Sequence, residues 1–393
     1  MIDFDNLNEQ VQDSSMVKIK ILGIGGAGCN TVNSMIDFLD VEGVSFVVAN
    51  SDVQSLRQSK AMNKIQLGVK TTKGLGCGAN PEVGRRATEE DLDRIMEQIG
   101  DADIVFIVAG MGGGTGSGGA PVVAKALKDR GILSIAIVTK PFSFEGKRRM
   151  MVADQALETL KKEVDTLIVV PNEKLLGLVD RSVSMIAAFE MINKLLIHSV
   201  KSISSIISRS GHINVDFADL RTIMKGMGLA MMGTGSAHGE NRAVEAAKKA
   251  ISSELLENMD IKSARGVLLN VCGGTDLSLH EINDAANVIY DASNASAHVI
   301  VGSVIDPTLE DEIIVSVVAT GFAPAASILQ TEKVVASVAP SEVAHAKIEE
   351  KRFYTQEPQL AKIMTEQVEI QATDSLDVPA YLRKQEFQDH TLE

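Results

Sequence analysis

The sequence predicts an α/β protein: a parallel sheet with helices on both faces, then a long central helix and a second, smaller α/β domain. Short, continuously apolar runs alternate along the chain with segments in which apolar residues recur every three or four positions. Strands that are apolar on both faces are typical of a parallel sheet buried between two layers of helices. One helical pattern, residues 184–209, is also unusually long, because roughly 25 residues exceeds most helices of globular proteins.

The first domain is expected over residues 17–183, after an N-terminal extension of residues 1–16. Its strands are predicted at the apolar runs 17–22, 45–50, 104–110, 132–140 and 166–172. Its helices are predicted at residues 30–39, 81–99, 121–130 and 150–163. The helix from Pro81 has the clearest start, since proline suits the first helical position and Asn80 before it is a good N-cap.

The second domain is expected over residues 210–322. Its strands are predicted at residues 264–273, 296–306 and 311–320, and its helices at residues 217–227, 241–254 and 278–292. The composition then changes, because all 32 glycines lie at or before Gly321. Residues 323–376 are rich in Ala, Glu, Gln, Lys and Ser with weak periodicity, so we expect a disordered, flexible linker. A C-terminal segment, residues 377–393, opens with the short stretch DVPAYLRKQ.

Composition and charge exclude several classes of protein. The net charge of −14 argues against non-specific nucleic-acid binding, but a bound nucleotide needs only a local cradle. The three cysteines show no C-x-x-C spacing, so neither a disulfide framework nor a zinc site is predicted. No apolar run approaches the roughly 18 residues of a membrane span, and the start MIDFDNLNEQ does not resemble a signal peptide. We therefore expect a cytoplasmic protein without direct membrane insertion.

The first glycine-rich segment, GIGGAG (23–28), follows a predicted strand and opens a helix. Glycines let the backbone approach a phosphate, and the helix N-terminus offers free N–H groups. The segment contains G-x-G-x-x-G, and Asp52 follows the next strand, where a ribose-binding acid lies in a Rossmann-like domain. An NAD-dependent oxidoreductase is thus one reading of residues 17–52, and a tight turn that binds nothing is another.

The second glycine-rich segment, residues 110–119, places seven glycines in ten positions between a strand and a helix. Packing does not account for so many glycines, so we expect this backbone to wrap around an anion, with Thr115 and Ser117 as hydroxyl donors. Two such loops at the ends of parallel strands suit a triphosphate better than a dinucleotide. The motif G-x-x-x-x-G-K-[ST] is missing from the sequence, which excludes a P-loop enzyme.

Several strings together carry a family resemblance. The loop GMGGGTGSG (110–118) and the segment GIGGAGCN (23–30) resemble the tubulin/FtsZ family. Five further strings occur in the family's order: LGCGANPEVG (75–84), TKPFSFEGKRR (139–149), VVPNEKLL (169–176), AAFEMIN (187–193) and NVDFADL (214–220). The similarity extends over residues 17–322, and DVPAYLRKQ resembles the C-terminal peptide of FtsZ proteins. Small departures from the family pattern occur at Ala27, Cys29, Ser51 and Ser117.

The resemblance implies a GTP-binding domain over residues 17–183, with GTP or GDP and Mg²⁺ as its ligands. It places Asn172, Phe189 and Asn193 at the guanine, and Glu145 with Arg149 at the ribose. Phe189 also fits an apolar stripe of the central helix, and Glu145 with Arg149 also fits an exposed helix pair. The remaining residues expected at the nucleotide are Gly25, Gly26, Ala27, Gly28, Cys29, Asn30, Asp52, Gly113, Gly114, Thr115, Gly116, Ser117 and Gly118.

The string NVDFADL bears on catalysis. Asp216 and Asp219 begin a predicted helix, and capping of that helix is the simpler interpretation. The resemblance instead implies that Asp216, Asp219 and Asn214 form a catalytic loop in which the two carboxylates position and polarise the attacking water. It further implies that this loop reaches the nucleotide of the next subunit, so that hydrolysis requires head-to-tail assembly.

The function expected from the resemblance is that of a polymerising GTPase. Its filaments would form the division ring at midcell, and Asp377–Gln385 would bind division proteins and membrane tethers. A tubulin-like plasmid-partition or phage filament protein is the alternative within the superfamily. A nucleotide-binding scaffold without catalysis would instead require Asp216 and Asp219 to be structural only.

Overall fold

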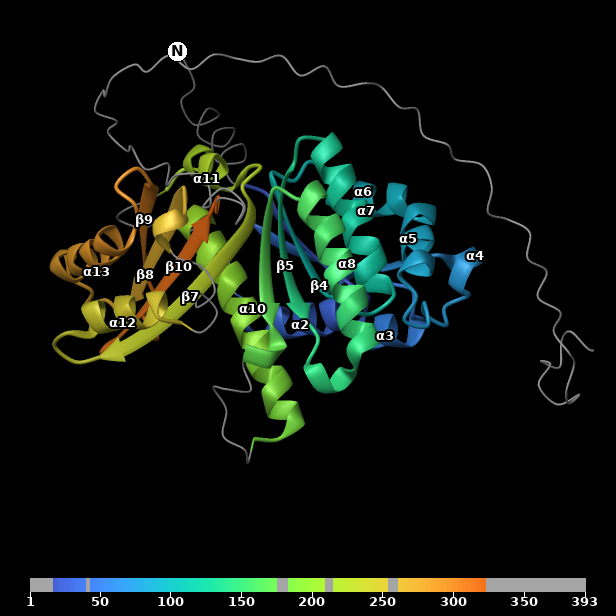
Figure 1. Ribbon diagram of the computed structural model, residues 1–393, viewed down its shortest axis with the longest axis horizontal. Coiled ribbons are helices and arrows are strands. Elements are labelled where there is room, and N and C mark those ends of the chain that lie inside the picture. The colour runs from blue at the N-terminus through green and yellow to red at the C-terminus, as the bar shows by residue number, and fades with distance from the viewer. Residues whose placement is uncertain (1–16, 40–42, 175–182, 209–214, 254–260, 323–393) are drawn as a thin grey trace, which may run out of the picture. The chain divides into compact units, whose positions relative to one another are not determined.

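A single mixed sheet of ten strands runs through the part of the chain that the computed structural model describes, residues 17–39, 43–174, 183–208, 215–253 and 261–322 (Figure 1). The strand order is β3-β2-β1-β4-β5-β6-β7-β10-β8-β9. The strands are β1 Ile19–Ile24, β2 Val44–Asn50, β3 Asn63–Gln66, β4 Ile104–Gly110, β5 Leu133–Lys140, β6 Thr166–Pro171, β7 Gly228–His238, β8 Gly266–Gly273, β9 His298–Ile305 and β10 Glu312–Thr320.

Pairing is parallel from β3 through β7, and β10 alone runs antiparallel to both of its neighbours, β7 and β8. This arrangement confirms the predicted α/β class with its parallel sheet. The expected linker and C-terminal segment, residues 323–393, lie outside the described residues, as does the extension of residues 1–16.

Helices connect these strands. Their bounds are α2 Gly25–Phe38, α3 Val53–Gln58, α4 Val69–Thr72, α5 Pro81–Glu90, α6 Leu92–Ile99, α7 Thr115–Asp129, α8 Lys147–Glu163, α10 Met185–Ser208, α11 Phe217–Met224, α12 Arg242–Ile251 and α13 Leu279–Ala292, with 3₁₀ turns η1 Ser143–Glu145 and η2 Ile261–Ser263. The Asn80 side chain caps α5 by accepting from the Glu82 N–H at 3.0 Å, as predicted. The helix expected over 81–99 is divided at Asp91, whose carboxylate accepts from the Gly68 N–H at 2.7 Å.

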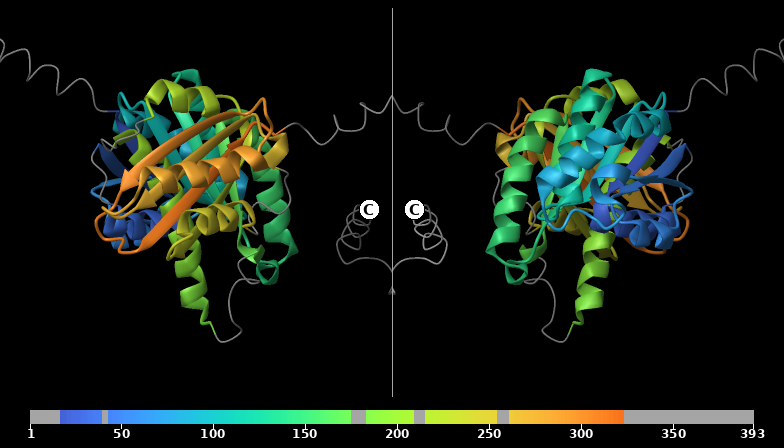
Figure 2. Two further views of the ribbon diagram at one scale, coloured as in Figure 1. Left: turned by 90° about the vertical axis from the view of Figure 1, so that its left-hand side faces the viewer. Right: turned by 90° about the vertical axis from the view of Figure 1, so that its right-hand side faces the viewer.

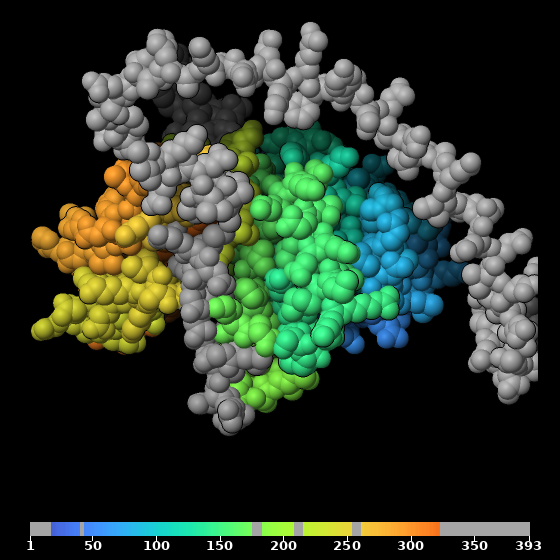
Figure 3. Space-filling view, viewed as in Figure 1, coloured from blue at the N-terminus to red at the C-terminus, as the bar shows by residue number. Residues whose placement is uncertain are grey.

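The central helix α10 packs across both halves of the sheet (Figure 1, Figure 2). Its buried residues Val200 and Ile203 belong to one apolar core with Ile168 of β6 and Leu268 of β8. Helices α2 and α11 contribute to the same core. A separate core lies under α5, α6, α7 and α8, and a third one lies under α12 and α13. Side chains of α8, α12 and α13 form much of the surface in the space-filling view (Figure 3).

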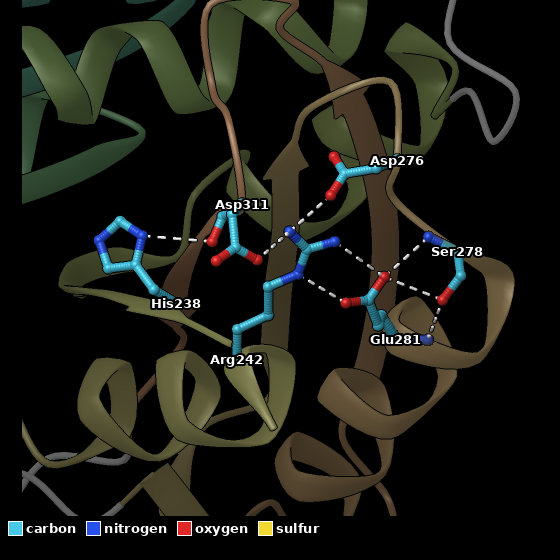
Figure 4. Close-up of polar contacts among 6 residues, drawn as sticks. All are labelled: His238, Arg242, Asp276, Ser278, Glu281 and Asp311. Atoms are coloured by element: carbon cyan, nitrogen blue, oxygen red, sulfur yellow. Dashed lines mark hydrogen bonds and ion pairs between the residues drawn. The ribbon is translucent and has the colours of Figure 1, made fainter. Parts of the chain in front are cut away.

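One buried guanidinium ties together three segments of the second half (Figure 4). The Arg242 side chain, 6% exposed at the start of α12, pairs with Glu281 at 2.7 Å, with Asp276 at 2.7 Å and with Asp311 at 3.4 Å. Glu281 also accepts hydrogen bonds from the N–H and hydroxyl of Ser278 at 2.8 and 2.9 Å. The cluster thereby holds the start of α13 and the turn before β10 against α12.

This cluster makes stability depend on pH. Burial raises the pKa of Glu281, but the hydrogen bonds from Arg242 and Ser278 outweigh it and leave that pKa below its usual value. A lowered folded-state pKa adds stability at pH values above the unfolded pKa of about 4.3, and that stability is lost as the pH falls through the folded pKa. We expect Arg242→Met to cost about 3 kcal/mol at pH 7, because Glu281 is then left without its cation.

The measurement is urea unfolding of the wild-type protein and of Arg242→Met from pH 7 down to pH 3. The difference in free energy of unfolding between the two proteins should become smaller once the pH drops below about 4. A constant difference over the whole range would mean that the ionisation of Glu281 does not contribute.

Candidate functional site

A cavity of about 490 Å³ opens at the C-terminal ends of the parallel strands β1, β4, β5 and β6. Ile24 and Gly110 line it from the last positions of β1 and β4, and Thr139 from the penultimate position of β5. Asn172 lines it from the position after β6. The first residues of α2 and α7 complete this wall, and the N-terminal turns of α10 form another. Ligands of open parallel sheets bind at this edge, so the fold and the cavity agree in position.

The first glycine-rich segment ends β1 and then forms the first turn of α2, which begins at Gly25 rather than at Asn30. Gly25 has a φ of 75°, and a Cβ at Gly26 would meet no atom within 4 Å, so the backbone of Gly26 is open to the cavity. Gly25, Gly26, Ala27 and Asn30 line the cavity. A Cβ at Gly28 would lie 2.3 Å from the Val108 carbonyl oxygen, so Gly28 lets α2 pack on β4.

Three of the expected nucleotide residues near this turn, Gly28, Cys29 and Asp52, lie outside the cavity lining. Cys29 is fully buried in the core beneath α2, where burial raises the pKa of its thiol to about 12. Asp52 caps α3 by accepting a hydrogen bond from the Gln54 N–H at 2.8 Å. Neither side chain is among those that line the cavity.

The second glycine-rich segment forms the wall next to α2. Gly113, Gly114, Thr115 and Gly116 line the cavity, and α7 begins at Thr115 with no side chain capping its first N–H groups. Two helix N-termini therefore meet at the cavity, and such termini favour an anion through free N–H groups and the helix dipole. The Ser117 hydroxyl instead accepts from the Gly112 N–H at 2.8 Å and shapes the loop from within.

The other end of the cavity holds amide and aromatic side chains. Asn172 is 5% exposed, and its Oδ1 atom has no hydrogen-bond partner among the described residues. Phe189 of α10 is 40% exposed and meets the ring of Phe142 edge-on at 5.7 Å, so it is not an ordinary core residue. The Asn193 Oδ1 atom accepts from the Thr31 hydroxyl at 3.0 Å. This end offers a flat aromatic ring, two amide side chains and one buried amide oxygen without a partner among the described residues, which suits a heterocyclic base.

Glu145 of η1 and Arg149 of the first turn of α8 contribute the charged groups of the lining. They form an ion pair of 2.7 Å, and Glu145 also accepts from the Phe142 N–H at 2.9 Å. Both line the cavity. Sequence reasoning did not select Thr31, although it lies one helical turn after Ala27 on α2. The further lining residues that it did not select are Ile24, Gly110, Met111, Thr139, Pro141, Ile192 and Leu196.

The predicted catalytic aspartates lie at the other end of the parallel strands, where β5 and β6 begin. Asp216 caps α11 by accepting from the Asp219 N–H at 2.7 Å. Helix α11 is tied to the amino ends of β5 and β6, since Arg221 donates to the carbonyl of Gly131 at 3.2 Å and Thr166 donates to the carbonyl of Met224. Figure 1 shows α11 and the start of α10 at opposite ends of the central strands. Asn214 lies outside the described residues.

Comparisons with known proteins assign the family. Residues 18–180 match the model of the Tubulin/FtsZ family, GTPase domain, and residues 228–323 match that of the FtsZ family, C-terminal domain. The empty FtsZ dimer of M. jannaschii is 41% identical, with a TM-score of 0.76 over 82% of this chain and 93% of that one. GDP-bound CetZ1 from Haloferax volcanii is 26% identical, with a TM-score of 0.69 over 78% of this chain and 95% of that one.

The chain belongs to the Tubulin/FtsZ family of GTPases. Within that family, its C-terminal domain is of the FtsZ type. These findings confirm the family resemblance and the predicted GTPase class, and they exclude the NAD-dependent oxidoreductase. Across the described residues, no helix combines the length and the apolar character that crossing a bilayer requires.

Proposed function

We propose that this GTPase holds GTP in the cavity and cleaves it when a second copy presents Asp216 and Asp219 to the phosphates. One observation carries the proposal: the cavity lies at the C-terminal edge of the parallel strands, whereas the aspartates lie at the amino-terminal edge. A chain with the two halves of a site on opposite edges completes the site by stacking head to tail. Such heterologous contacts do not close by symmetry and therefore produce filaments.

The lining residues match the parts of a guanine nucleotide. The N–H groups at the starts of α2 and α7 receive the phosphates, and Glu145 with Arg149 faces the ribose. Phe189 stacks on the base, while Asn172 and Asn193 bind its edge. Mg²⁺ would supply charge neutralisation at the phosphates. The Asp216 and Asp219 carboxylates of the second copy orient and polarise the attacking water.

Charge explains why the aspartates come from a neighbour. Two carboxylates beside a triphosphate in one chain would repel the nucleotide before catalysis. When a second copy brings them after binding, they act on the water without weakening the affinity for GTP. Among the expected nucleotide residues that face the cavity, Glu145 is the one carboxylate, and Arg149 neutralises it.

The cellular role that we propose is the filament of the division ring at midcell. The family supports it, and so does the stretch Asp377–Gln385, which we propose as the binding site for division proteins and membrane tethers. The solved relatives include a dimer and a GTPγS-bound protofilament of CetZ2 from Haloferax volcanii, 24% identical with a TM-score of 0.67 over 78% of this chain and 94% of that one. The fold is thus compatible with self-association.

Turnover per molecule should rise steeply with protein concentration, because the complete site exists only between two copies. Phosphate release with GTP and Mg²⁺ measures this, and light scattering in GTP against GDP reports assembly in parallel. A turnover rate per molecule that stays constant from the lowest protein concentration upward would instead mean that each copy holds a complete site.

Replacing the buried amide at the base end tests whether it binds the ligand. Asn172→Leu should stabilise the nucleotide-free protein by about 1 kcal/mol, because it removes an unsatisfied buried oxygen. The same change should weaken GTP binding at least about tenfold, since the base loses a partner. Urea unfolding and titration with a fluorescent GTP analogue measure the two effects.

The chain offers a matched control for this substitution. Asn270 of β8 is also 5% exposed with an unpartnered Oδ1 atom among the described residues, and it does not line the cavity. Asn270→Leu should leave GTP affinity at the wild-type level. Equal losses of affinity in the two variants would show that Asn172 acts on the fold and not on the nucleotide.

A further inference from the structure

Three buried side chains behind the second glycine-rich segment form a closed ring of hydrogen bonds. The Ser51 and Thr115 hydroxyl oxygens are 2.6 Å apart, the Cys77 thiol donates to Ser51 Oγ at 3.2 Å, and the Thr115 hydroxyl donates to Cys77 Sγ at 3.4 Å. Each group can donate once and accept once in this ring. Ser51 is fully buried, and Cys77 and Thr115 are 8% and 9% exposed.

The ring joins three segments that are distant in sequence. Ser51 follows β2, Cys77 lies in the loop between α4 and α5, and Thr115 is the first residue of α7. Of the three, Thr115 lines the nucleotide cavity and Ser51 and Cys77 do not. Ser51 and Cys77 can therefore influence a ligand through Thr115 and the neighbouring residues of the second glycine-rich segment.

The loop that carries Cys77 is held in an unusual backbone conformation. Lys73 and Ala79 are non-glycine residues with φ values of 54° and 58°, which L-residues adopt at a cost. The Ser51 carbonyl accepts from the Gly76 N–H at 3.2 Å and from the Thr72 hydroxyl at 3.3 Å. Ser51 thus fixes the loop with its backbone and contacts Thr115 with its side chain.

The same loop packs directly on the residue before α7. A Cβ at Gly114 would lie 2.6 Å from the Cys77 Cβ and 3.0 Å from the Asn80 nitrogen, so there is no slack between the loop and the N-cap of α7. Because the first N–H groups of α7 have no capping side chain, the direction in which they point depends on how this turn is held. The ring is the side-chain connection that holds it.

We propose that Ser51 and Cys77 are positioning residues for the phosphates of GTP. Through the ring they fix the Thr115 side chain, and with it the first turn of α7, in the orientation that directs its N–H groups at the phosphates. The ring also uses the Thr115 hydroxyl proton, so the backbone of this turn makes the phosphate contacts. This inference rests on the GTP site of the proposed function and adds two residues that do not touch the ligand.

The test compares variants that break the ring with one that keeps it. Ser51→Ala and Cys77→Ala each remove one member, and we expect the Kd for GTP to rise about tenfold. Cys77→Ser retains a donor and an acceptor, so its Kd should stay within about twofold of wild type. Ser204→Ala is the matched control, because Ser204 is a fully buried serine of α10 whose hydroxyl bonds to the Val200 carbonyl.

Two further measurements separate positioning from general damage to the fold. The affinity for guanosine, which has no phosphates, should be the same in all the variants. Alkylation of Cys77 by iodoacetamide, followed by peptide mass spectrometry, should be faster in Ser51→Ala than in wild type, with the buried Cys29 as internal reference. This second readout requires no nucleotide.

The outcomes are distinct. Wild-type affinity for GTP in both Ser51→Ala and Cys77→Ala would overturn the inference, and so would a Cys77→Ser variant as weak as Cys77→Ala. An equal loss of guanosine binding would show that the ring supports the fold as a whole and would also overturn it. A wild-type protein that fails to bind GTP would overturn the proposed function itself.

Discussion

Asp219→Asn should bind GTP like the wild-type protein and yet hydrolyse it at least about a hundredfold more slowly. Asp219 lies on α11, at the amino-terminal edge of the parallel strands, so the substitution leaves the cavity of its own chain intact. Asparagine keeps the shape of the side chain and removes its charge. Phosphate release and a GTP-binding titration on the same preparation measure the two properties.

The second aspartate needs a substitution that preserves the helix cap. Asp216 accepts from the Asp219 N–H at 2.7 Å, and loss of such a cap costs about 1 kcal/mol. Asp216→Asn keeps an N-cap acceptor, so a drop in its turnover reports the lost charge and not an unravelled helix. Unchanged turnover in both variants would remove the aspartates from catalysis.

Mixing two inactive variants tests whether the site is shared. Gly26→Leu fills the cavity, because Gly26 is open to it, and this chain still carries both aspartates. Asp219→Asn keeps an intact cavity. In a mixture, Gly26→Leu can present its aspartates to the nucleotide of Asp219→Asn, so part of the turnover should return. A mixture without any activity would contradict the shared site.

Gly118→Ala should destabilise the protein by about 3 kcal/mol, although alanine is the better helix former. A Cβ at Gly118 would lie 2.0 Å from the Pro81 carbonyl oxygen and 2.5 Å from the Arg85 nitrogen, and both are backbone atoms of α5. The two helices would have to separate to admit the methyl group. The midpoint of chemical unfolding measures the loss.

Gly113→Ala is the control from the same glycine-rich segment. A Cβ there would meet nothing within 4 Å, so stability should stay within about 0.5 kcal/mol of wild type. Equal losses of stability in the two variants would mean that close helix packing does not explain the effect of Gly118→Ala.

The sequence was most informative where burial is uniform. The strand expected at 104–110 coincides with β4, and that expected at 132–140 differs from β5 by one residue, because each is a predominantly apolar run. Strand β7, Gly228–His238, was not predicted. Its glycines, alanines and methionines have little strand propensity, and pairing with β10 stabilises it instead.

The glycine-rich segments show what local pattern does not reveal. Both were predicted as loops. Residues 111–114 do form a loop, but residues 25–28 already form the first turn of α2, and residues 115–119 form the first turn of α7. Their glycines also serve different purposes: Gly26 and Gly113 leave space for a ligand, whereas Gly28 and Gly118 let helices approach their neighbours. The local sequence does not distinguish these two roles, because the tertiary fold determines which atoms lie next to each glycine.

The shortest strand of the sheet limits how copies of the molecule can associate. Strand β3 terminates the sheet after four residues, and Lys64 at its second position is exposed. An edge strand that is this short and carries an exposed lysine offers another chain little unpaired backbone with which to form a strand pair. This flank of the molecule is therefore a poor template for strand addition, and head-to-tail contact does not have to compete with strand pairing at β3.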